Sequence, residues 1–491
     1  MSTASDFRRA LGYSAATAAF AILLFVPLSG LNPQAHRLAA VMAAVVILWI
    51  SEALPLPVTA VLGAAVCVVL RVAPAREVFA PFADPLMFLF IGSFILARAI
   101  FLNGLDRRLA FGVLSIKWVG ARPGRILFAY GAVTAFISAW ISNTATTAMM
   151  LTIGLAIIAF LSDPERAGKT RIDPRYAIAL MLMTAFAASV GGLATPIGTP
   201  PNIIGLSFIR ELVGVEFSFF KWMMLGTPAA VLLFLWIFVY LNFLCPAGVA
   251  EIPNSAEMLR AERERLGAWT RGQKSTLVAF LATVVLWVGP GVIALIYGET
   301  SAVYRAVNGS VPEAVAAVLG ATLLFLLPGT GDRRAITWDE AVGIDWGVVL
   351  LYGGGFALGV LSFQTGLAEA VGRGLTGILP ISDGLGLLVA STLIALLVSE
   401  TTSNTAAANM VVPVVIAIAR AQGADPLEPA LGATMGASLG FMLPVSTPCN
   451  AIVYGSGFVP LGKMIRYGFL LDITGVVVIV TIVKLVVPFL R

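Results

Sequence analysis

The alternation of apolar and polar segments along the chain predicts a membrane protein built from helices. Apolar runs of about 18 residues or more recur from end to end, and such a run crosses a hydrocarbon core of about 30 Å as a helix. About eleven transmembrane helices are predicted, at residues 12–30, 37–53, 55–72, 84–104, 176–212, 222–246, 275–297, 310–328, 346–366, 427–461 and 467–490. Segments 105–120 and 367–380 have the pattern of surface helices that follow a span.

Composition supports the membrane prediction and excludes several functional classes. Of 491 residues, 59% are hydrophobic and only 12% are charged, against roughly 25% charged in soluble domains. The net charge of +5 does not indicate nucleic-acid binding, because Lys and Arg lie in the gaps between apolar runs. Cys67, Cys245 and Cys449 show no disulfide framework or metal-binding spacing. His36 is the single histidine, so histidine metal sites and histidine proton relays are excluded.

Three landmarks recur in the same order and reveal an internal repeat. The pattern S-x-x-x-S-N-T-A occupies 138–145 and again 399–406, and T-P-x-N occupies 199–202 and again 447–450. Segments 86–110 and 348–372 also share G-x-F-x-L followed by Gly-Leu. A single Ser-Asn-Thr would be explained by ordinary packing of small polar residues in membrane helices, and a single T-P-x-N by a proline kink. The full ordered set favours a duplicated functional unit.

Basic residues predict that the two halves are inverted. The first Ser-Asn-Thr segment has basic residues on both sides, at Arg107, Arg108, Lys117, Arg122 and Arg125 before it and Arg166, Lys169, Arg171 and Arg175 after it. Both of its ends are therefore predicted to be cytoplasmic, as in a re-entrant hairpin. The second segment has only Arg373 before it and Arg420 after it, so both of its ends are predicted to be outside. Inverted repeats with broken helices at the bilayer midplane are typical of transporters.

The predicted organisation follows from these signals. Residues 1–35 form the first transmembrane helix, with the N-terminus cytoplasmic, and the C-terminus is outside. The first repeat is 36–250, with a re-entrant hairpin at 123–161 and a broken helix at 176–212. A cytoplasmic linker follows at 251–274, and the second repeat is 275–491, with its hairpin at 385–420 and its broken helix at 427–461. Arg37, Arg71 and Arg76 fall outside in this arrangement and disagree with the charge rule.

The residue types at the hairpin tips suit the binding of both cations and anions. One helix ends at a tip and exposes carbonyls, and the next begins there and exposes N–H groups. Carbonyl, hydroxyl and amide oxygens are hard donors for a small cation, whereas N–H groups at a helix start attract an anion. Two facing tips can hold two cations with a dicarboxylate between them. The T-P-x-N stretches predict a second wall, because proline removes a helix N–H and leaves a carbonyl free.

Charged side chains are missing from these motifs. Neither Ser-Asn-Thr nor T-P-x-N stretch contains Arg or Lys, so bound cations are expected to offset the charge of a dianion. Glu400 lies three residues before Ser403, where it either tunes the second cation site or pairs with an arginine. For Arg98, inside the fourth span, snorkelling or a structural ion pair is favoured over substrate binding.

With these residues the chain resembles the divalent anion:sodium symporter family. The resemblance extends from SEALPLPVTA (51–60) through both Ser-Asn-Thr hairpins to STPCNAIVYGSG (446–457). It implies uptake of dicarboxylates such as succinate, malate or fumarate, or of citrate or sulfate in some members. It also implies an all-α polytopic fold of eleven transmembrane helices in two inverted repeats, a homodimer in membrane lipid, and a transport domain that moves like an elevator.

The resemblance assigns a role to each matching position. The first sodium site would consist of Ser138, Ser142, Asn143 and the backbone of Gly198, and the second of Ser399, Thr402, Asn404 and the backbone of Ser446. The residues that would meet substrate carboxylates are Ser142, Asn143, Thr144, Ser403, Asn404, Thr405, Thr447 and Pro448, with Thr199 and Pro200 nearby. Ser399 and Thr402 stand where some members have other small residues.

The function predicted from sequence is sodium-coupled import of C4 dicarboxylates across the plasma membrane of a bacterium, with Na⁺ as the co-transported ion. A sodium-independent exchanger, or a citrate or sulfate transporter on the same fold, stays open as an alternative. An intramembrane enzyme is disfavoured, because the sequence has no histidine metal cluster, no paired intramembrane aspartates and no Ser-His dyad.

Overall fold

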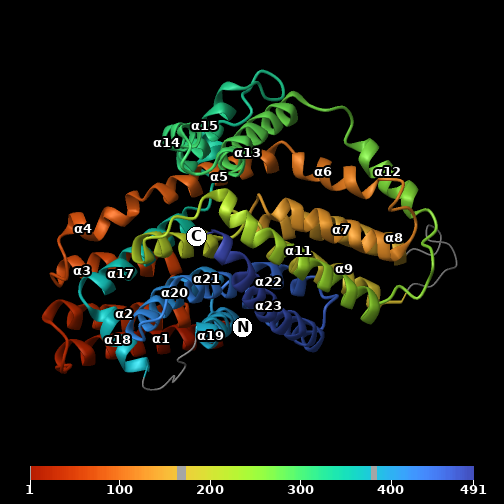
Figure 1. Ribbon diagram of the computed structural model, residues 1–491. Coiled ribbons are helices and arrows are strands. Elements are labelled where there is room, and N and C mark those ends of the chain that lie inside the picture. Colours follow the sequence, from red (N-terminus) through yellow and green to blue (C-terminus); the bar gives the residue numbers. More distant parts are fainter. Residues whose placement is uncertain (1, 163–172, 377–383, 491) are drawn as a thin grey trace.

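The computed structural model describes residues 2–162, 173–376 and 384–490, which fold into helices packed against helices (Figure 1). Within these ranges the one extended pairing is an isolated antiparallel bridge between Pro328 and Arg334. Each segment predicted as a span contains a helix or a broken pair of helices. The predicted all-α polytopic fold is confirmed.

The helices follow one another along the chain with short connections. Those of the first half are α1 (Ser2–Phe25), α2 (Pro33–Ser51), α3 (Leu56–Val69), α4 (Ala75–Phe79), η1 (Ala80–Ala83), α5 (Pro85–Leu102), α6 (Leu105–Leu114), α7 (Pro123–Ser138), α8 (Asn143–Ser162), α9 (Arg175–Gly191), α10 (Pro200–Phe208), η2 (Ile209–Val213) and α11 (Phe219–Leu244). Those of the second half are α12 (Ser255–Arg265), α13 (Arg271–Tyr297), α14 (Ala302–Ser310), α15 (Glu313–Leu326), α16 (Trp338–Ala341), α17 (Trp346–Gln364), α18 (Leu367–Thr376), α19 (Gly384–Thr401), α20 (Asn404–Ala421), α21 (Leu427–Gly436), α22 (Pro448–Gly455) and α23 (Leu461–Leu490). Part of the predicted surface helix 367–380 lies outside the described residues.

Length and composition alone give a different number of spans from the sequence pattern. Among the described residues, nine helices are long and apolar enough to cross a membrane, or ten if the bent pair α14–α15 counts as one span. The nine include α8, α19 and α20, which belong to the predicted hairpins. By contrast, α9 and α21 are each too short to cross a membrane alone, because each is one half of a broken span. The nine therefore include three hairpin arms, whereas the two broken spans and shorter helices such as α3 are not among them.

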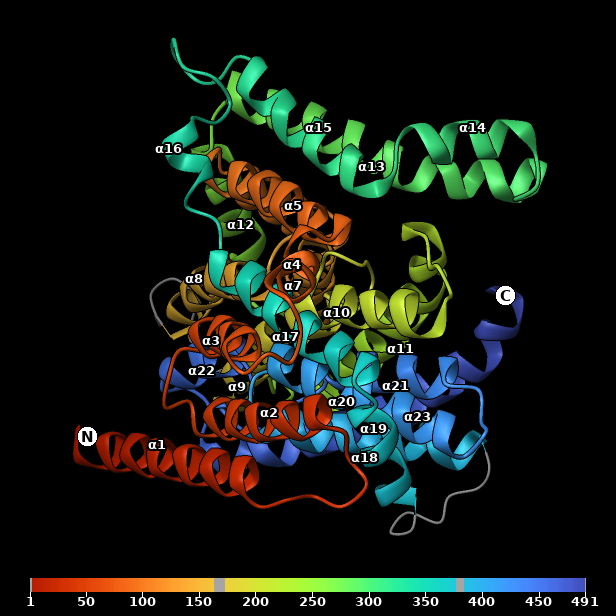
Figure 2. The same cartoon turned by 90° about the vertical axis from the view of Figure 1, so that its left-hand side faces the viewer.

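Small residues let the helices approach closely. Figure 2 shows α13, α14 and α15 as a layer set apart from most of the bundle, with α5 beside it. A Cβ added at Gly92 on α5 would lie 2.6 Å from the backbone of Ala317 on α15, so this crossing requires glycine. The two broken helices cross in the same way, because a Cβ at Gly205 on α10 would collide with Thr434 on α21.

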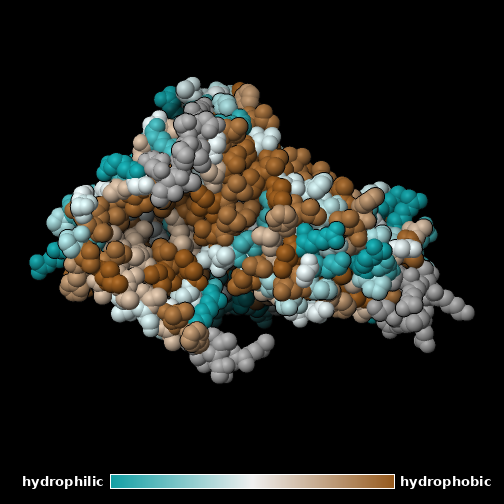
Figure 3. Space-filling view, turned by 90° about the horizontal axis from the view of Figure 1, so that it is seen from below, coloured by the Kyte–Doolittle hydropathy of each residue, from teal (hydrophilic) through white to brown (hydrophobic). Residues whose placement is uncertain are grey.

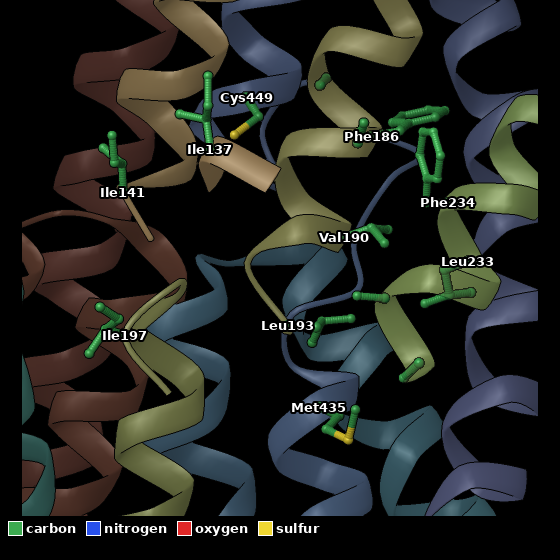
Figure 4. Packing of buried hydrophobic residues seen from close by; sticks show 14 of the residues in the cluster. Ile137, Ile141, Phe186, Val190, Leu193, Ile197, Leu233, Phe234, Met435 and Cys449 are labelled. Atoms are coloured by element: carbon green, nitrogen blue, oxygen red, sulfur yellow. The ribbon is translucent and has the colours of Figure 1, made fainter. Parts of the chain in front are cut away.

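An apolar core surrounds the break after α9. Figure 4 shows Phe186 and Val190 of α9 near Leu233 and Phe234 of α11, with Leu193 in the unwound segment beyond α9. Leu193 is fully buried, and its carbonyl oxygen accepts a hydrogen bond from the Trp222 indole at 3.0 Å. This packing keeps lipid away from the free backbone groups of the break, which membranes tolerate only where protein or water surrounds them.

The outer surface suits a hydrocarbon environment. Figure 3 shows hydrophobic residues over a broad area of one face of the molecule. Large apolar side chains are widely exposed, among them Phe243 at 82% and Phe489 at 83%. Lipid is the solvent such side chains require, so the protein is an integral membrane protein.

Candidate functional site

Each Ser-Asn-Thr tripeptide lies at the turn between two helices. In the first half, α7 ends at Ser138 and α8 begins at Asn143. In the second half, α19 ends at Thr401 and α20 begins at Asn404, where Ser403 is the N-cap and accepts a hydrogen bond from the Ala406 N–H at 3.2 Å. The start of α20 is thus set by the serine of its Ser-Asn-Thr tripeptide.

An asparagine closes the break between α9 and α10. The segment 192–199 is unwound around Pro196, which has no N–H to continue a helix. The fully buried Asn202 donates from its amide nitrogen to the carbonyls of Gly192 at 2.9 Å and Thr195 at 2.8 Å. Its amide oxygen is buried without a hydrogen-bond partner.

The break between α21 and α22 repeats this arrangement 248 positions later in the chain (202 + 248 = 450). Asn450 is also fully buried and donates to the carbonyls of Gly440 at 3.1 Å and Leu443 at 3.0 Å, again next to a proline, Pro444. Its amide oxygen is likewise without a partner. The internal repeat read from sequence therefore has a structural counterpart in matched hydrogen bonds.

Oxygen atoms converge on Asn143 at the first tip. The Ser138 hydroxyl lies 2.7 Å from its amide oxygen, and the carbonyl oxygens of Ala188 and Gly198 lie 3.1 Å from the same atom. Turned by 180°, the amide would donate its N–H groups to these carbonyls. With the oxygen inward, four hard oxygens face one another, which is the arrangement a small cation stabilises. The Gly198 backbone is among the ligands that the resemblance implies, whereas the Ala188 carbonyl is not, because a backbone carbonyl carries no sequence signal.

The second tip has a similar cluster. The fully buried Ser399 hydroxyl lies 2.8 Å from the amide oxygen of Asn404 and 2.8 Å from the carbonyl oxygen of Ala437. Thr402 is also buried, but its hydroxyl donates to the Val398 carbonyl at 2.8 Å. Its oxygen keeps a lone pair free for a ligand.

Glu400 holds the unwound segment beside this cluster. Its carboxylate accepts hydrogen bonds from the Met442 N–H at 2.8 Å, the Leu443 N–H at 3.2 Å and the Ser446 hydroxyl at 2.5 Å. Among the described residues no arginine forms an ion pair with Glu400, so the structure does not support the paired-arginine interpretation. Because Ser446 is a predicted sodium ligand, the carboxylate is placed to position the second cluster.

The two tips and the two breaks line a single cavity of about 470 Å³, within the range of about 300–1,000 Å³ usual for small-molecule sites. Every residue that the sequence assigns to substrate carboxylates lines it: Ser142, Asn143, Thr144, Thr199, Pro200, Ser403, Asn404, Thr405, Thr447 and Pro448. Gly198 lines it as well, whereas Ser138, Ser399, Thr402 and Ser446 are buried behind the wall.

Four helix N-termini meet at this cavity, those of α8, α10, α20 and α22. Thr447 caps α22 by accepting from the Asn450 N–H at 3.1 Å, whereas the Thr199 side chain makes no cap hydrogen bond. All four present the positive end of a helix dipole. Unpaired N–H groups come from α8 and α20, because Pro200, Pro201 and Pro448 at the starts of α10 and α22 have no N–H. The cavity is therefore suited to anions.

Arg98 is the main feature that sequence reasoning misplaced. It projects from α5 into the wall of the cavity, together with Asp345, the N-cap of α17. Its Nε atom is buried without a hydrogen-bond partner, and Arg98 is absent from the ion pairs between described residues. The snorkelling or ion-paired position expected from sequence is therefore not what the structure shows. The sequence did carry one signal of a functional role for Arg98, namely a charged side chain inside a predicted span.

The fold and the site together define a polytopic membrane protein with a central cavity suited to anions, as in a transporter. The model of the family described as the sodium:sulfate symporter transmembrane region matches residues 8–490. The chain therefore belongs to this family, the divalent anion:sodium symporters that its motifs resemble.

Named relatives agree with this assignment. The chain is 33% identical over 473 residues to the sodium-dependent dicarboxylate transporter SdcS of Staphylococcus saprophyticus, covering 95% of this chain and 89% of the relative. It is 31% identical over 445 residues to the SdcS of Staphylococcus aureus strain USA300, and the match covers 90% of this chain and 84% of that relative. These relatives are transporters, which confirms that the protein is not an enzyme.

Solved structures show the same fold at low sequence identity. The YdaH transporter of Alcanivorax borkumensis superposes with a TM-score of 0.54 at 14% identity, covering 84% of this chain and 87% of that one. The MtrF protein of Neisseria gonorrhoeae superposes with a TM-score of 0.52 at 14% identity, covering 83% and 82%.

Proposed function

We propose that this protein is a sodium-coupled symporter that imports C4 dicarboxylates such as succinate, malate and fumarate across the bacterial plasma membrane. The observation that carries the proposal is the shared cavity, into which both Ser-Asn-Thr tips and both T-P-x-N starts open. The names of the relatives, sodium-dependent dicarboxylate transporters, support both the ion and the substrate class.

Two sodium ions would bind behind the cavity wall. The first would take the oxygens around Asn143, from Ser138, Ser142 and Gly198. The second would take those around Asn404, from Ser399, Thr402 and Ser446. Each asparagine belongs to both a cation cluster and the cavity wall. Sodium would turn each amide oxygen inward and leave the amide nitrogen toward the substrate. Anion binding would then depend on cation binding, which is the coupling a symporter requires.

A substrate with two carboxylates would lie between the tips, with one carboxylate near Ser142–Thr144 and the other near Ser403–Thr405. The helix N-termini supply N–H donors to both. Arg98 adds a formal positive charge from α5. A dianion with two sodium ions carries no net charge, so only a third co-transported cation would make transport electrogenic.

The movement we propose is of the elevator type, in a homodimer. The hairpins, broken helices, α11 and α23 would form the transport domain and move as one body against α1–α5 and α13–α17. The N-terminus would be cytoplasmic and the C-terminus outside. Cysteines placed on the two bodies, cross-linked in the membrane, test the movement by blocking uptake reversibly. Native mass spectrometry of the purified protein tests the dimer.

Uptake of radiolabelled succinate into proteoliposomes tests the function. We expect accumulation with external sodium and none when choline replaces it. Unchanged accumulation in choline would exclude symport. A competition panel of fumarate, malate, citrate and sulfate against labelled succinate then identifies the preferred anion, and stronger competition by citrate or sulfate would replace the C4 assignment.

A sodium-independent dicarboxylate exchanger is the second candidate, and Arg98 is the observation that favours it. A fixed guanidinium on the cavity wall can offset part of the substrate charge without an ion. Liposomes preloaded with unlabelled succinate in sodium-free buffer separate the two. Exchange without sodium, dependent on the preloaded anion, supports this candidate and excludes obligatory sodium coupling.

A further inference from the structure

Asp472 is a buried acid that the proposed sites do not use. It lies within the span α23, is 2% exposed, and neither carboxylate oxygen has a hydrogen-bond partner. Its polar surroundings are the Glu400 carboxylate and the backbone of Gly440 and Phe441. Tight packing holds α23 there, because a Cβ at Gly468 would lie 2.2 Å from the Phe441 carbonyl oxygen.

Among the described residues, no basic group forms an ion pair with either of these acids. The charged neighbour of Asp472 is Glu400, which is itself only 3% exposed, and the nearby titratable side chain of α11 is Tyr240. Lys484, also on α23, is engaged by Glu428 at 2.5 Å. Two facing carboxylates without a counter-charge are strongly unfavourable inside a membrane protein. Unpartnered acids at membrane depth mark ion pathways.

The position of the pair ties it to the second sodium site. Glu400 directly follows Ser399 in the chain, and its Oε2 atom lies 2.5 Å from the Ser446 hydroxyl. The first repeat has no such acid, since the position equivalent to Glu400 is Ala139 (400 − 261 = 139). The extra negative charge therefore belongs to the second half alone.

We propose that Glu400 and Asp472 hold a third sodium ion, behind the second sodium site. Carboxylate oxygens are hard ligands suited to a small hard cation. Glu400 already accepts three hydrogen bonds, which fix its carboxylate beside the second sodium site. The ion would also bridge α23 to the hairpin tip. The proposal rests on the proposed function, to which it adds one ion per cycle.

Sodium-dependent thermal stability of the purified full-length protein tests the site without transport. An ion that binds only the folded state stabilises it by RT ln(1 + [Na⁺]/Kd). At saturation, the slope of stability against ln[Na⁺] therefore counts bound ions. We expect Asp472→Asn to lower this slope by about one ion and to lower the Hill coefficient for sodium in succinate uptake by about one. Asp472→Glu, which keeps the charge, should retain the wild-type slope.

Asp106→Asn is the matched control, because Asp106 is a buried acid with an unpartnered oxygen on α6, away from the cavity. Its sodium slope should equal that of the wild type. A wild-type slope and Hill coefficient for Asp472→Asn would overturn the proposal and assign a proton or a purely structural role to the pair. Asn404→Ala, which alters the second sodium site itself, separates the proposed symport from the proposed third sodium site. If it lowers the slope while Asp472→Asn does not, the proposed symport stands and the third site fails.

Discussion

Asn450→Ala should weaken sodium binding through the backbone rather than through a ligand. The side chain donates two hydrogen bonds, to Gly440 and Leu443, that hold the unwound segment in shape. Each is worth about 1 kcal/mol net, so the substitution removes about 2 kcal/mol. The sodium-free segment can relax to pair these carbonyls again, whereas the ion-bound segment cannot. The cost therefore falls on the bound state, and about 2 kcal/mol corresponds to a roughly 30-fold loss of affinity.

The assay is succinate uptake into proteoliposomes over a range of sodium concentrations. We expect the half-saturating sodium concentration to rise by up to about 30-fold, with uptake recovering at high sodium. Asn103→Ala is the control, because Asn103 donates three hydrogen bonds, to Ala99, Thr276 and Ala335, away from the cavity. That variant should lose stability but keep its sodium dependence. If Asn450→Ala takes up succinate with the wild-type sodium dependence, the break does not shape the cation site.

Five further substitutions probe other parts of the molecule. Asn143→Ala and Asn404→Ala should each abolish sodium-driven uptake while the protein elutes normally in gel filtration; near-normal uptake would contradict the site assignment. Arg98→Gln should raise the KM for succinate about tenfold, the effect of roughly 1.4 kcal/mol of lost attraction, and an unchanged KM would remove Arg98 from the substrate path. Gly192→Ala should impair the first sodium site, since the new Cβ would lie 2.5 Å from the Asn143 amide oxygen; a wild-type sodium curve would refute this. Burial raises the pKa of Asp106 on the surface helix α6 from 3.8 to about 6, so stability is lost as the pH rises between these two values, and the loss is complete above the higher one. Asp106→Asn should therefore melt higher than wild type at pH 8, with the difference gone below a pH of about 4.

The sequence was informative where polarity and periodicity decide the structure. Long apolar runs located the spans, and paired capping residues located the helix starts at Asn143 and Asn404, because Ser, Asn and Thr end and begin helices for local reasons. The short helices between the spans, such as α4, α12, α14 and α16, were not predicted. They are amphipathic or only a few residues long, and their apolar content is too small to stand out beside a membrane span.

Features that depend on contacts between distant segments could not be predicted from patterns in the sequence. The carbonyls of Ala188 and Ala437 lie within hydrogen-bond distance of the Asn143 amide and the Ser399 hydroxyl, and any residue type could supply them because they belong to the backbone. Arg98 faces the cavity because α5 packs beside the tips, which no local pattern records. The approach of Asp472 to Glu400 joins positions 72 residues apart in two different spans (472 − 400 = 72). Each of these features changes the electrostatics of the site rather than its fold.

The two repeats share a scaffold and differ in charge. In both, an asparagine closes a proline-containing break and a serine hydroxyl meets the amide of the tip asparagine. Only the second repeat adds a carboxylate at the residue after that serine, Glu400 against Ala139. A cation at the second tip therefore lies in a more negative field than one at the first, although the neutral ligands are alike. Because opposite charges stabilise each other strongly away from water, the second half should bind its ions more tightly and fill before the first.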